Sequence, residues 1–494
     1  MQKWAYKWQV LFAVVFGTFM VIMDATIVNV ALPTLQRDFG GNLSDVQWIV
    51  SAYTLALGIV TPISGFLADR FGIKRVYMVS LGLFTLGSAL CAIAPGLPFL
   101  VLFRVIQGLG GSSVIPLSTA LLFKVFEPKE RGQAYGIYGI ALVMAPALGP
   151  LISGAFVEYL NWRFIFLVNL PIGLAGLYFA GRLLREEKSE KKPRLDGWGL
   201  AASTVAFGLI LYGFSISENE GWGSAQVILS LAVGAVALLA FCVIELRRRE
   251  GLVDLRLFRL PTFLVGSLVG WVSVIALFGA EFLLPLYLQI LRGQTALQTG
   301  FLLLPLALAS GFSVPIAGRF SDKFGPRWLV AGGFALLMVN TWQLSSLTLD
   351  TAFWYIALLL VLRGISFGMI IQVTQQASLL DVKPWQLNRA SALISSSRLV
   401  FQSLGVSILA TIVSSTAGKA PAFTSGTRPD PAALAAFQQN YLHGLENAYV
   451  ATFWLALVSL VLALFLPGRP VTEAKGTTEA PVEVQATTDT SKVA

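Results

Sequence analysis

Hydrophobic residues along this chain occur in long runs that charged side chains rarely interrupt. The runs reach 20 residues or more, and about 20 residues of helix cross the hydrocarbon core of a bilayer. Strands of a membrane barrel would instead alternate in polarity over about ten residues, so the pattern predicts membrane-spanning helices. Fourteen spans are expected, at residues 10–33, 46–68, 76–95, 98–122, 133–157, 163–183, 197–217, 224–246, 262–286, 297–318, 328–348, 353–378, 391–415 and 445–466.

The composition agrees with a membrane protein. Of the 494 residues, 56% are hydrophobic and 12% are charged, whereas a soluble domain carries about 25% charged residues. The first span, 10–33, exceeds the apolar core of a secretory signal, which has about 7–15 residues, and it lacks a small-residue cleavage site. We therefore expect it to remain as a helix. The predicted fold class is an all-α polytopic membrane protein with 14 transmembrane helices.

The net charge of +9 would suit a protein that binds nucleic acid, but the positions of the basic residues indicate otherwise. If both termini are cytoplasmic, 27 of the 35 Lys and Arg residues fall on the cytoplasmic side. Such an excess follows the positive-inside rule, so the charge reports orientation. We expect a multi-pass protein of the cytoplasmic membrane with both termini in the cytoplasm and no nucleic-acid partner.

Two sequence markers repeat along the chain. "GFLADRFGIKRV" (65–76) follows the second span and "GRFSDKFGPRWL" (318–329) follows the tenth, at an offset of 253. A looser pair, "LFRVIQGLGGS" (102–112) and "VLRGISFGMI" (361–370), has a similar offset of 259. Parallel halves that hold a ligand between them near the midplane are a transporter architecture. The expected domains are an N-terminal six-helix half (1–184), a linker with two additional helices (185–261), a C-terminal six-helix half (262–466) and a disordered cytoplasmic tail (467–494).

The loops and the cysteines offer no catalytic or metal-binding set. In the longest external loop, Asp430 and Pro431 fit an N-cap and a first helical position and predict a short interfacial helix. No nucleotide-binding G-x-x-x-x-G-K-[ST] loop is present, which argues against ATP as the energy source within this chain. Cys91 and Cys242 fall in separate spans and are expected to be inert. His443, the only histidine, lies in an external loop, so proton binding would require carboxylates. We do not expect an enzyme.

Several segments resemble one known family. The loop "GFLADRFGIKR" is similar to the signature between helices two and three of the major facilitator superfamily. Four others resemble its fourteen-span drug:proton antiporters: "MDATIVNVALP", "RVIQGLGG", "APALGPLISG" and "NWRFIFLVNLPIG". The resemblance covers about residues 8–466. The sequence departs from the pattern at Ile73, where a basic residue is usual, and at Ala145 and Ser153, which replace glycines.

The resemblance implies the major facilitator fold, with two six-helix halves and two extra central helices. It also implies multidrug efflux by antiport, with the proton gradient as energy source and no cofactor. The expected partners are lipophilic small-molecule substrates, protons and membrane lipids. Whether a periplasmic adaptor takes part stays open.

Asp24 is an acidic residue in the middle of the first span. A carboxylate at the bilayer centre costs about 2.5–3.5 kcal/mol on insertion scales, and Asp24 lies only about 4 Å from the expected midplane at 1.5 Å per residue. Two explanations are open, a structural tie to a neighbouring helix or a proton-binding site. Burial favours the neutral form of a carboxyl group, and the resemblance points to proton exchange. We expect Asp24 to alternate between carrying a proton and facing cargo.

Other charged residues also fall within spans. Arg104 needs a buried partner, which Asp24 or backbone carbonyls could supply, and the resemblance implies a role in proton coupling. Glu281 lies near the position that repeats Asp24; it is either a membrane-interface acid, a second coupling carboxylate or an attractor of cationic substrate. Arg363 repeats the position of Arg104. Arg398 is expected to extend toward the cytoplasmic interface.

The repeated loops predict a cytoplasmic gate. Their aspartates stand near the start of the next helix, where negative charge is favourable by about 0.3–1 kcal/mol, and their glycines suit tight turns. A capped, charged turn is the alternative. The resemblance favours a latch in which Asp69 pairs with basic residues. The expected gate residues are Gly65, Asp69, Arg70, Gly72, Lys74, Asp322 and Gly325.

Two further groups are candidates for movement and for binding. Prolines bend helices and small residues permit close helix packing; the resemblance implies an export-associated hinge at Pro146, Gly149, Pro150 and Gly154. For the substrate, aromatic faces attract cations, and ordinary helix packing is the alternative. The candidate substrate residues are Trp271, Gln372 and Gln376.

The function expected from these features is proton-coupled export of amphiphilic or cationic drugs and toxic compounds across the cytoplasmic membrane. One alternative is an exporter of a single amphiphile, such as a lipid precursor, a siderophore or a metabolite. A remote alternative is a non-transporting membrane sensor or scaffold, which would not need the acids and loop signatures that this chain retains.

Overall fold

A computed structural model describes residues 5–39, 43–186, 196–248, 251–281, 283–418 and 431–468. The predicted tail lies outside these residues from 469 onward. Within the described residues the chain is helical and contains no strand. The all-α fold class predicted from the hydrophobic pattern is confirmed.

The first half and the central pair contain the following helices: α1 (Tyr6–Phe39), α2 (Leu43–Val60), η1 (Thr61–Ile63), α3 (Ser64–Phe71), α4 (Ile73–Ala92), α5 (Leu97–Gly111), α6 (Val114–Val125), η2 (Pro128–Glu130), α7 (Arg131–Tyr159), α8 (Phe164–Leu167), α9 (Asn169–Leu183), α10 (Gly197–Glu220) and α11 (Ala225–Arg247). The rest of the chain contains η3 (Leu255–Arg259), α12 (Pro261–Glu281), α13 (Leu283–Leu286), the π-helical turn η4 (Tyr287–Leu291), α14 (Ala296–Phe324), α15 (Pro326–Ser345), α16 (Phe353–Ser378), η5 (Pro384–Gln386), α17 (Leu387–Ala417) and α18 (Pro431–Ala463).

Thirteen segments in the described part of the chain are long and apolar enough to cross a membrane. The helix α15, expected as the span 328–348, has 20 residues but does not belong to this set. It carries buried polar side chains such as Asn340 and Thr341, which lower its hydropathy. With α15 included, the described helices form the fourteen-span arrangement that the sequence predicts.

The expected span 98–122 is interrupted. Pro116 has no N–H to donate to the carbonyl oxygen of Ser112, four residues earlier, and the helix divides there into α5 and α6. The Oγ1 of Thr61 donates to that carbonyl oxygen at 3.2 Å. Thr61 itself lies in η1, where Pro62 similarly interrupts the expected span 46–68. The two breaks therefore lie against each other.

The expected interfacial helix before the last span is not separate. A single helix, α18, begins at Pro431 and continues through the membrane-spanning residues to Ala463. Tyr441 is buried in it, and Phe437 packs against the same apolar cluster. These contacts extend the span into one long helix. The predicted N-cap, Asp430, lies outside the described residues.

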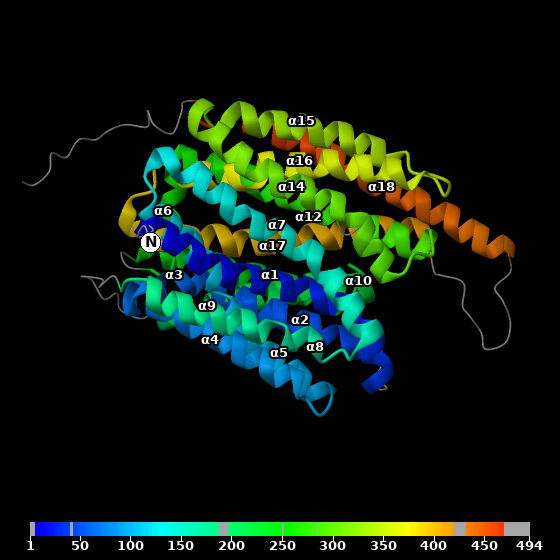
Figure 1. Cartoon of the computed structure of the whole chain (residues 1–494), viewed down its shortest axis with the longest axis horizontal. Helices are drawn as coiled ribbons and strands as arrows, with labels where there is room; N and C mark the ends of the chain where they lie inside the picture. Colours follow the sequence, from blue (N-terminus) through cyan, green and yellow to red (C-terminus); the bar gives the residue numbers. More distant parts are fainter. Residues whose placement is uncertain are drawn as a thin grey trace, which may run out of the picture.

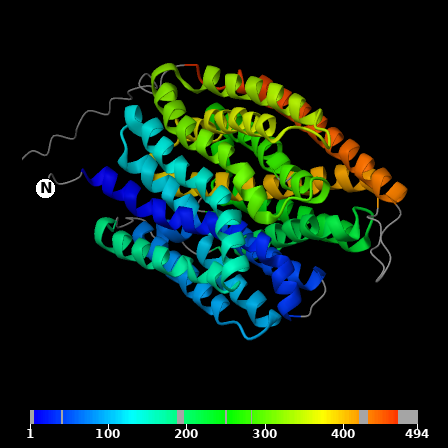
Figure 2. The same ribbon diagram turned by 45° about the vertical axis from the view of Figure 1, so that its right-hand side comes forward.

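The helix α7 joins the two halves by packing along α14 (Figure 1). Figure 2 shows the same two helices, cyan and green, side by side after a 45° turn. Glycines allow this approach: a methyl group added at Gly136 would lie 2.6 Å from the Cα of Pro315, and one at Gly132 would collide with the carbonyl oxygen of Gly318. Small residues at such contacts let helix backbones come close in a membrane.

The two extra helices pack against each other, and α10 also contacts α2 of the first half and α17 of the second. Their apolar core includes Phe207 and Phe241, which cluster with Ile63 and Phe66 of the first half. Ser51 of α2 and Ser215 of α10 are joined by a hydrogen bond of 2.8 Å. The central pair thus covers one side of the contact between the halves.

The two ends of the described chain lie at the same end of the bundle. Lys7 at the start of α1 donates to Glu130, beside the start of α7, at 2.6 and 2.7 Å. Arg327 at the start of α15 donates to the carbonyl oxygen of Leu466, just beyond α18, at 2.7 Å. We call this the gate end, because it also carries the α3–α4 and α14–α15 loops with Asp69 and Asp322.

Candidate functional site

Asp24 is completely buried within the first half. Its Oδ2 accepts a charged hydrogen bond from Nη1 of Arg104 on α5. Its Oδ1 accepts from Nε2 of Gln107 and from Nδ2 of Asn169 on α9, each at 2.8 Å. A buried ion pair is tolerated only when further hydrogen bonds satisfy both ions. The three donors meet that requirement for the carboxylate.

Arg104 is also completely buried. Its Nε donates to the carbonyl oxygen of Ile49 on α2 at 3.0 Å, and its Nη1 donates to Oε1 of Gln107 at 2.8 Å. The guanidinium lies 4.0 Å from the ring centre of Tyr53, an arrangement in which the aromatic face stabilises the cation. Nη2 has no hydrogen-bond partner among the described residues. The pair therefore connects α1, α2, α5 and α9.

Three members of this cluster were missed by the sequence reasoning: Gln107, Asn169 and Ser88. Asn169 donates to the Oγ of Ser88 on α4 at 3.1 Å, and Ser88 donates to the carbonyl oxygen of Phe166 at 2.9 Å. Gln107 and Asn169 are polar residues inside apolar spans, as Asp24 is. Both amides can therefore be found in the sequence by the same criterion as Asp24.

The hydrogen-bond partners of Asp24 all come from the first half. In this conformation the carboxylate therefore does not face the contact between the halves, where a transported compound would lie. The expectation that Asp24 alternately faces a proton and cargo needs this correction. Any influence of a proton at Asp24 on cargo must pass through the packing of α1.

The other charged residues within spans lie in different surroundings. Glu281 is the last residue of α12, and its side chain lies outside the described part of the structure. Arg363 is buried on α16 and donates through Nη2 to the carbonyl oxygen of Leu277 on α12 at 3.0 Å. It thus joins two helices of the second half, as Arg104 joins helices of the first.

Asp69 connects the two halves at the gate end. Its Oδ1 accepts from Nδ2 of Asn388 and its Oδ2 from Nε of Arg389, each at 2.8 Å, at the start of α17. A methyl group added at Gly65 would lie 2.6 Å from the carbonyl oxygen of Asn388, so α3 and α17 are in close contact. Gly72 joins α3 to α4 with a φ of 95°, a conformation that favours glycine.

Asp322 makes the corresponding connection from the second half to the first. Its two carboxylate oxygens accept from the backbone N–H groups of Gly132 and Gln133, at 2.9 and 3.2 Å, in the first turn of α7. A carboxylate there is stabilised by the unpaired N–H groups and the helix dipole. Gln376 on α16 donates to the same carboxylate at 3.1 Å. Gly325 follows with a φ of 82°.

The basic residues of the first loop serve the first half. Nζ of Lys74 donates to the carbonyl oxygens of Gly181 and Leu184, each at 2.7 Å, at the end of α9. The guanidinium of Arg70 lies 5.5 Å from the ring centre of Phe71. The basic residue that pairs with Asp69 is Arg389, which the sequence reasoning did not single out.

The candidate hinge residues lie on α7, which contains Pro146 and Pro150 within its length. A methyl group added at Gly149 would collide with Oγ1 of Thr26 on α1, and one at Gly154 would lie 3.4 Å from Cβ of Leu297 on α14. The helix that carries the two prolines therefore contacts both the helix of Asp24 and the opposite half.

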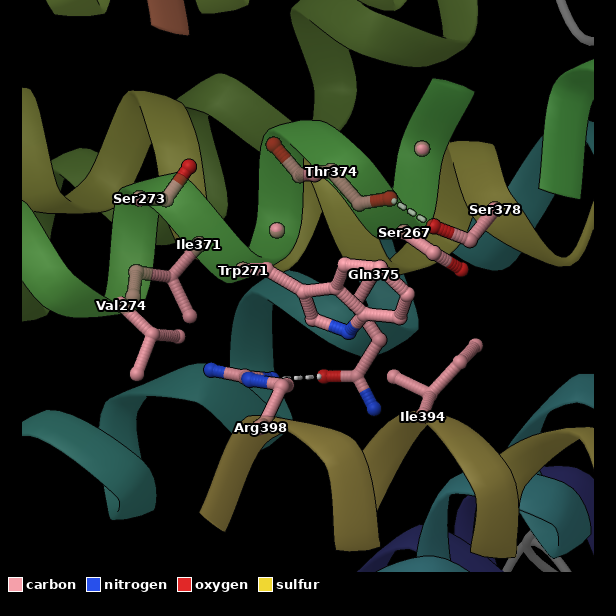
Figure 3. A pocket seen from close by; sticks show the side chains of 12 residues that line it. Ser267, Trp271, Ser273, Val274, Ile371, Thr374, Gln375, Ser378, Ile394 and Arg398 are labelled. Carbon is pink, nitrogen blue, oxygen red and sulfur yellow. Dashed lines mark hydrogen bonds between the residues drawn. The ribbon is translucent and has the colours of Figure 1, made fainter. Parts of the chain in front are cut away.

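A recess opens between α12, α16 and α17 and contains Trp271 and Arg398 (Figure 3). The indole of Trp271 donates to the Oγ of Ser397 at 2.8 Å and stacks on Phe401 with ring centres 4.8 Å apart. Nη1 of Arg398 donates to Oε1 of Gln375 at 3.0 Å. The expectation that Arg398 extends to the membrane interface is wrong, because its head group is held inside the bundle by this amide.

The three glutamines of α16 have separate environments. Nε2 of Gln375 donates to Oγ1 of Thr119 on α6, at 3.2 Å, and so reaches the first half. Gln376 lies at the gate end, where its Nε2 donates to Oδ1 of Asp322. Gln372 is buried near Gly139 of α7, and both polar atoms of its amide lack a hydrogen-bond partner among the described residues.

A family model described as Major Facilitator Superfamily matches residues 14–410. The chain belongs to the major facilitator superfamily. It is 31% identical to the lincomycin resistance protein LmrB of Bacillus subtilis, over 92% of this chain and 95% of that protein. It is 32% identical to the multidrug resistance protein B homolog of Mycobacterium tuberculosis, over 92% and 88% of the two chains. The tetracenomycin C resistance and export protein of Streptomyces glaucescens is 30% identical over 83% of this chain and 77% of that one.

A solved structure with the same fold is the human organic anion transporter MFSD10, with a TM-score of 0.64 and 16% identity over 91% of this chain and 99% of that chain. As a member of the major facilitator superfamily, the chain is a multi-pass membrane transporter related to drug-efflux proteins, and it is not an enzyme. In this fold, the two aspartate contacts at the gate end cross-link the halves, and the buried charge cluster lies within one half.

Proposed function

We propose that this chain is a proton-coupled antiporter that exports drug-like amphiphilic compounds across the cytoplasmic membrane. Asp24 is the proton-binding group, the gate end and both termini are cytoplasmic, and residues 1–184 and 262–466 are the two moving halves. The observation that carries the proposal is the buried contact of Asp24 with Arg104, Gln107 and Asn169.

Protonation of Asp24 would remove the negative charge that these three donors face. Arg104 would then be a buried cation without a counter-ion, and removing one partner of a buried pair costs about 3–5 kcal/mol. The cluster holds α1 against α5 and α9 and also reaches α2 through Ile49. Protonation of Asp24 would therefore make the present packing of α1 less favourable relative to a different packing.

The helix α7 is placed to transmit such a change. Thr26, two residues after Asp24 on α1, packs against Gly149 of α7. The first turn of α7 is bound by Asp322 of the opposite half. A shift of α1 would thus act on the same helix that closes the gate end. We infer that proton and cargo are coupled through this packing rather than by competition for one carboxylate.

In the proposed cycle, the conformation described here is closed toward the cytoplasm by the Asp69 and Asp322 contacts. A proton from outside reaches Asp24, the α1–α7 packing changes and the gate end opens. The proton then leaves to the cytoplasm, cargo binds between the halves, and the contacts re-form as the halves rock outward. The names of the relatives, which refer to lincomycin, to multidrug resistance and to tetracenomycin C, support drug-like cargo.

Transport into vesicles with an imposed pH gradient tests the proposal. The full chain in liposomes, with the gate end outward, should accumulate radiolabelled lincomycin when the lumen is acidic and should stop when nigericin collapses the gradient. Asp24→Asn should abolish this uptake. Asp45→Asn, which changes an exposed acid on α2, is the matched control and should keep it. Undiminished gradient-driven uptake by Asp24→Asn would overturn the assignment of the proton site.

A further inference from the structure

We propose that the recess between α12, α16 and α17 binds the anionic group of a flat aromatic compound, and that Arg398 makes the site selective for negative charge. The inference rests on the proposed function, because the bound compound would be its cargo. The class it names is aromatic carboxylates, sulfonates and phenolates, rather than the lipophilic cations that Trp271 suggested from the sequence.

Arg398 is a partly buried cation whose guanidinium donates a hydrogen bond to a neutral amide. Its Nη1 donates to Oε1 of Gln375, and the ion pairs formed by the described residues do not include it. Glu281, whose side chain is not described, lies ten residues beyond Trp271 on α12, or about 15 Å along the helix. A guanidinium withdrawn from water without a counter-ion is destabilising, and a bound anion would supply the missing charge.

The same recess offers a flat apolar surface beside this charge. Trp271 is held in place by its hydrogen bond to Ser397 and by stacking on Phe401 at an interplanar angle of 18°. Figure 3 shows the side chains of Trp271, Gln375 and Arg398 converging in the recess from α12, α16 and α17. An aromatic body against the indole would place an acidic substituent within reach of the guanidinium, which forms paired hydrogen bonds with carboxylates.

The recess lies close to the gate end, so opening of the gate would expose it to the cytoplasm. Gln375 bonds Thr119 of the first half, and its neighbour Gln376 bonds Asp322, which closes the gate end. Separation of the halves at this end would release Gln375 and widen the recess toward the cytoplasm. In the conformation described here the recess has room for little more than a single water molecule.

The buried amide of Gln372, one turn before Gln375 on α16, also suggests that a ligand binds near this part of the helix. Only 2% of its surface is exposed, yet neither amide atom has a partner among the described residues. Buried polar groups without partners are rare in folded proteins. Opening of the contact with Gly139 on α7 would let this amide bond cargo or water. Gln372 does not line the recess itself, but its neighbour Ile371 does. This conformation therefore leaves the amide of Gln372 without a partner among the described residues and the charge of Arg398 without a counter-ion among them.

Two dyes of the same shape and opposite charge test the inference. Fluorescein methyl ester and rhodamine 123 share a xanthene skeleton and a methyl ester, but at pH 8 the first is an anion and the second a cation. Equilibrium binding to the full chain in nanodiscs is measured by fluorescence anisotropy, with empty nanodiscs subtracted. The wild-type chain should bind the anion more tightly than the cation.

Arg398→Gln should weaken binding of fluorescein methyl ester by about 10- to 100-fold, the range for loss of a charged hydrogen bond, and should leave rhodamine 123 unchanged or tighter. Arg398→Lys should still bind the anionic dye more tightly than the cationic dye, but with reduced affinity for the anion. Gln375→Glu, which places a carboxylate against Arg398, should also remove the preference for the anion. Arg292→Gln is the matched control, because Arg292 bonds Tyr287 and Thr351 outside the recess.

Tighter binding of rhodamine 123 than of fluorescein methyl ester by the wild-type chain would overturn the inference. An equal loss of affinity for both dyes in Arg398→Gln, with an unchanged unfolding midpoint, would also overturn it. If Arg398→Gln does not fold, Arg398→Lys and Gln375→Glu decide the question by the same comparison. The binding measurement uses no pH gradient. If the wild-type chain shows no preference for the anion but retains gradient-driven lincomycin uptake, this inference alone is refuted. If it prefers the anion but shows no gradient-driven uptake, proton coupling alone is refuted.

Discussion

Removing the charge of Asp24 should destabilise the chain, and removing the charge of Arg104 as well should restore most of the loss. In Asp24→Asn the amide still accepts a hydrogen bond, but Arg104 stays buried without a counter-ion. Both side chains are 0% exposed, so solvent cannot compensate for the missing charge. We expect the free energy of unfolding to fall by about 3–5 kcal/mol, the range for breaking a buried pair from one side.

The double variant Asp24→Asn/Arg104→Gln removes both charges and leaves amides that can bond each other and Gln107. Replacement of a complete buried ion pair by well-packed hydrophobic side chains of similar volume is often close to neutral for stability, because no uncompensated charge remains; a pair of amides likewise leaves no buried charge. We therefore expect the double variant to recover most of the lost stability while transport stays abolished. The cycle of wild type, two single variants and the double variant isolates the pair's coupling energy.

The assay is the midpoint of thermal unfolding of each variant in nanodiscs, followed by intrinsic tryptophan fluorescence. Asp45→Asn is the control for loss of an exposed carboxylate and should have the same unfolding midpoint as the wild type. If the double variant loses as much stability as the two single variants together, Asp24 and Arg104 are not coupled as a buried ion pair. An Asp24→Asn variant with an unchanged midpoint would also contradict the prediction, because the pair would then not be buried and charged.

Two further predictions concern the gate end. Asn388→Asp would place a second carboxylate where the amide now bonds Asp69 at 2.8 Å, and repulsion between the like charges should open the gate end. A cysteine introduced beside this contact in a cysteine-free background should then react faster with a water-soluble maleimide. An unchanged labelling rate would count against the latch. Gly132→Ala would collide with the carbonyl oxygen of Gly318 and should destabilise the closed conformation by about 1–3 kcal/mol, measured by the same labelling. Gly197→Ala, where an added methyl group meets nothing within 4 Å, is its control and should label as the wild type does.

Much of the fold follows from the sequence because hydrophobic length alone defines a membrane helix. The repeated loops also identified the two halves, and their aspartates, Asp69 and Asp322, fall at the contacts that join them. The breaks at Pro62 and Pro116 were not predicted, because both prolines lie in stretches whose composition is otherwise continuous with a span. Only the packing of these breaks against each other, through Thr61, explains why the chain tolerates them.

The charge cluster was predicted in part. Asp24 and Arg104 stand out because each is charged within an apolar run, but one sequence does not give the rotation of each helix about its axis. That rotation decides that Asp24 points into its own half and that Arg398 points into the recess instead of toward the interface. The partner of Asp69, Arg389, is likewise distant in sequence and is found only when α17 is placed against α3.

Proton release from the purified chain shows directly whether Asp24 carries the transported proton. Lincomycin is added to detergent-solubilised protein in a weakly buffered solution containing a pH-sensitive dye, and released protons are counted per chain. Wild-type protein should release protons as the compound binds, and Asp24→Asn, with its fold verified, should release none. Equal release by both proteins would contradict the account, because another group would then carry the transported proton.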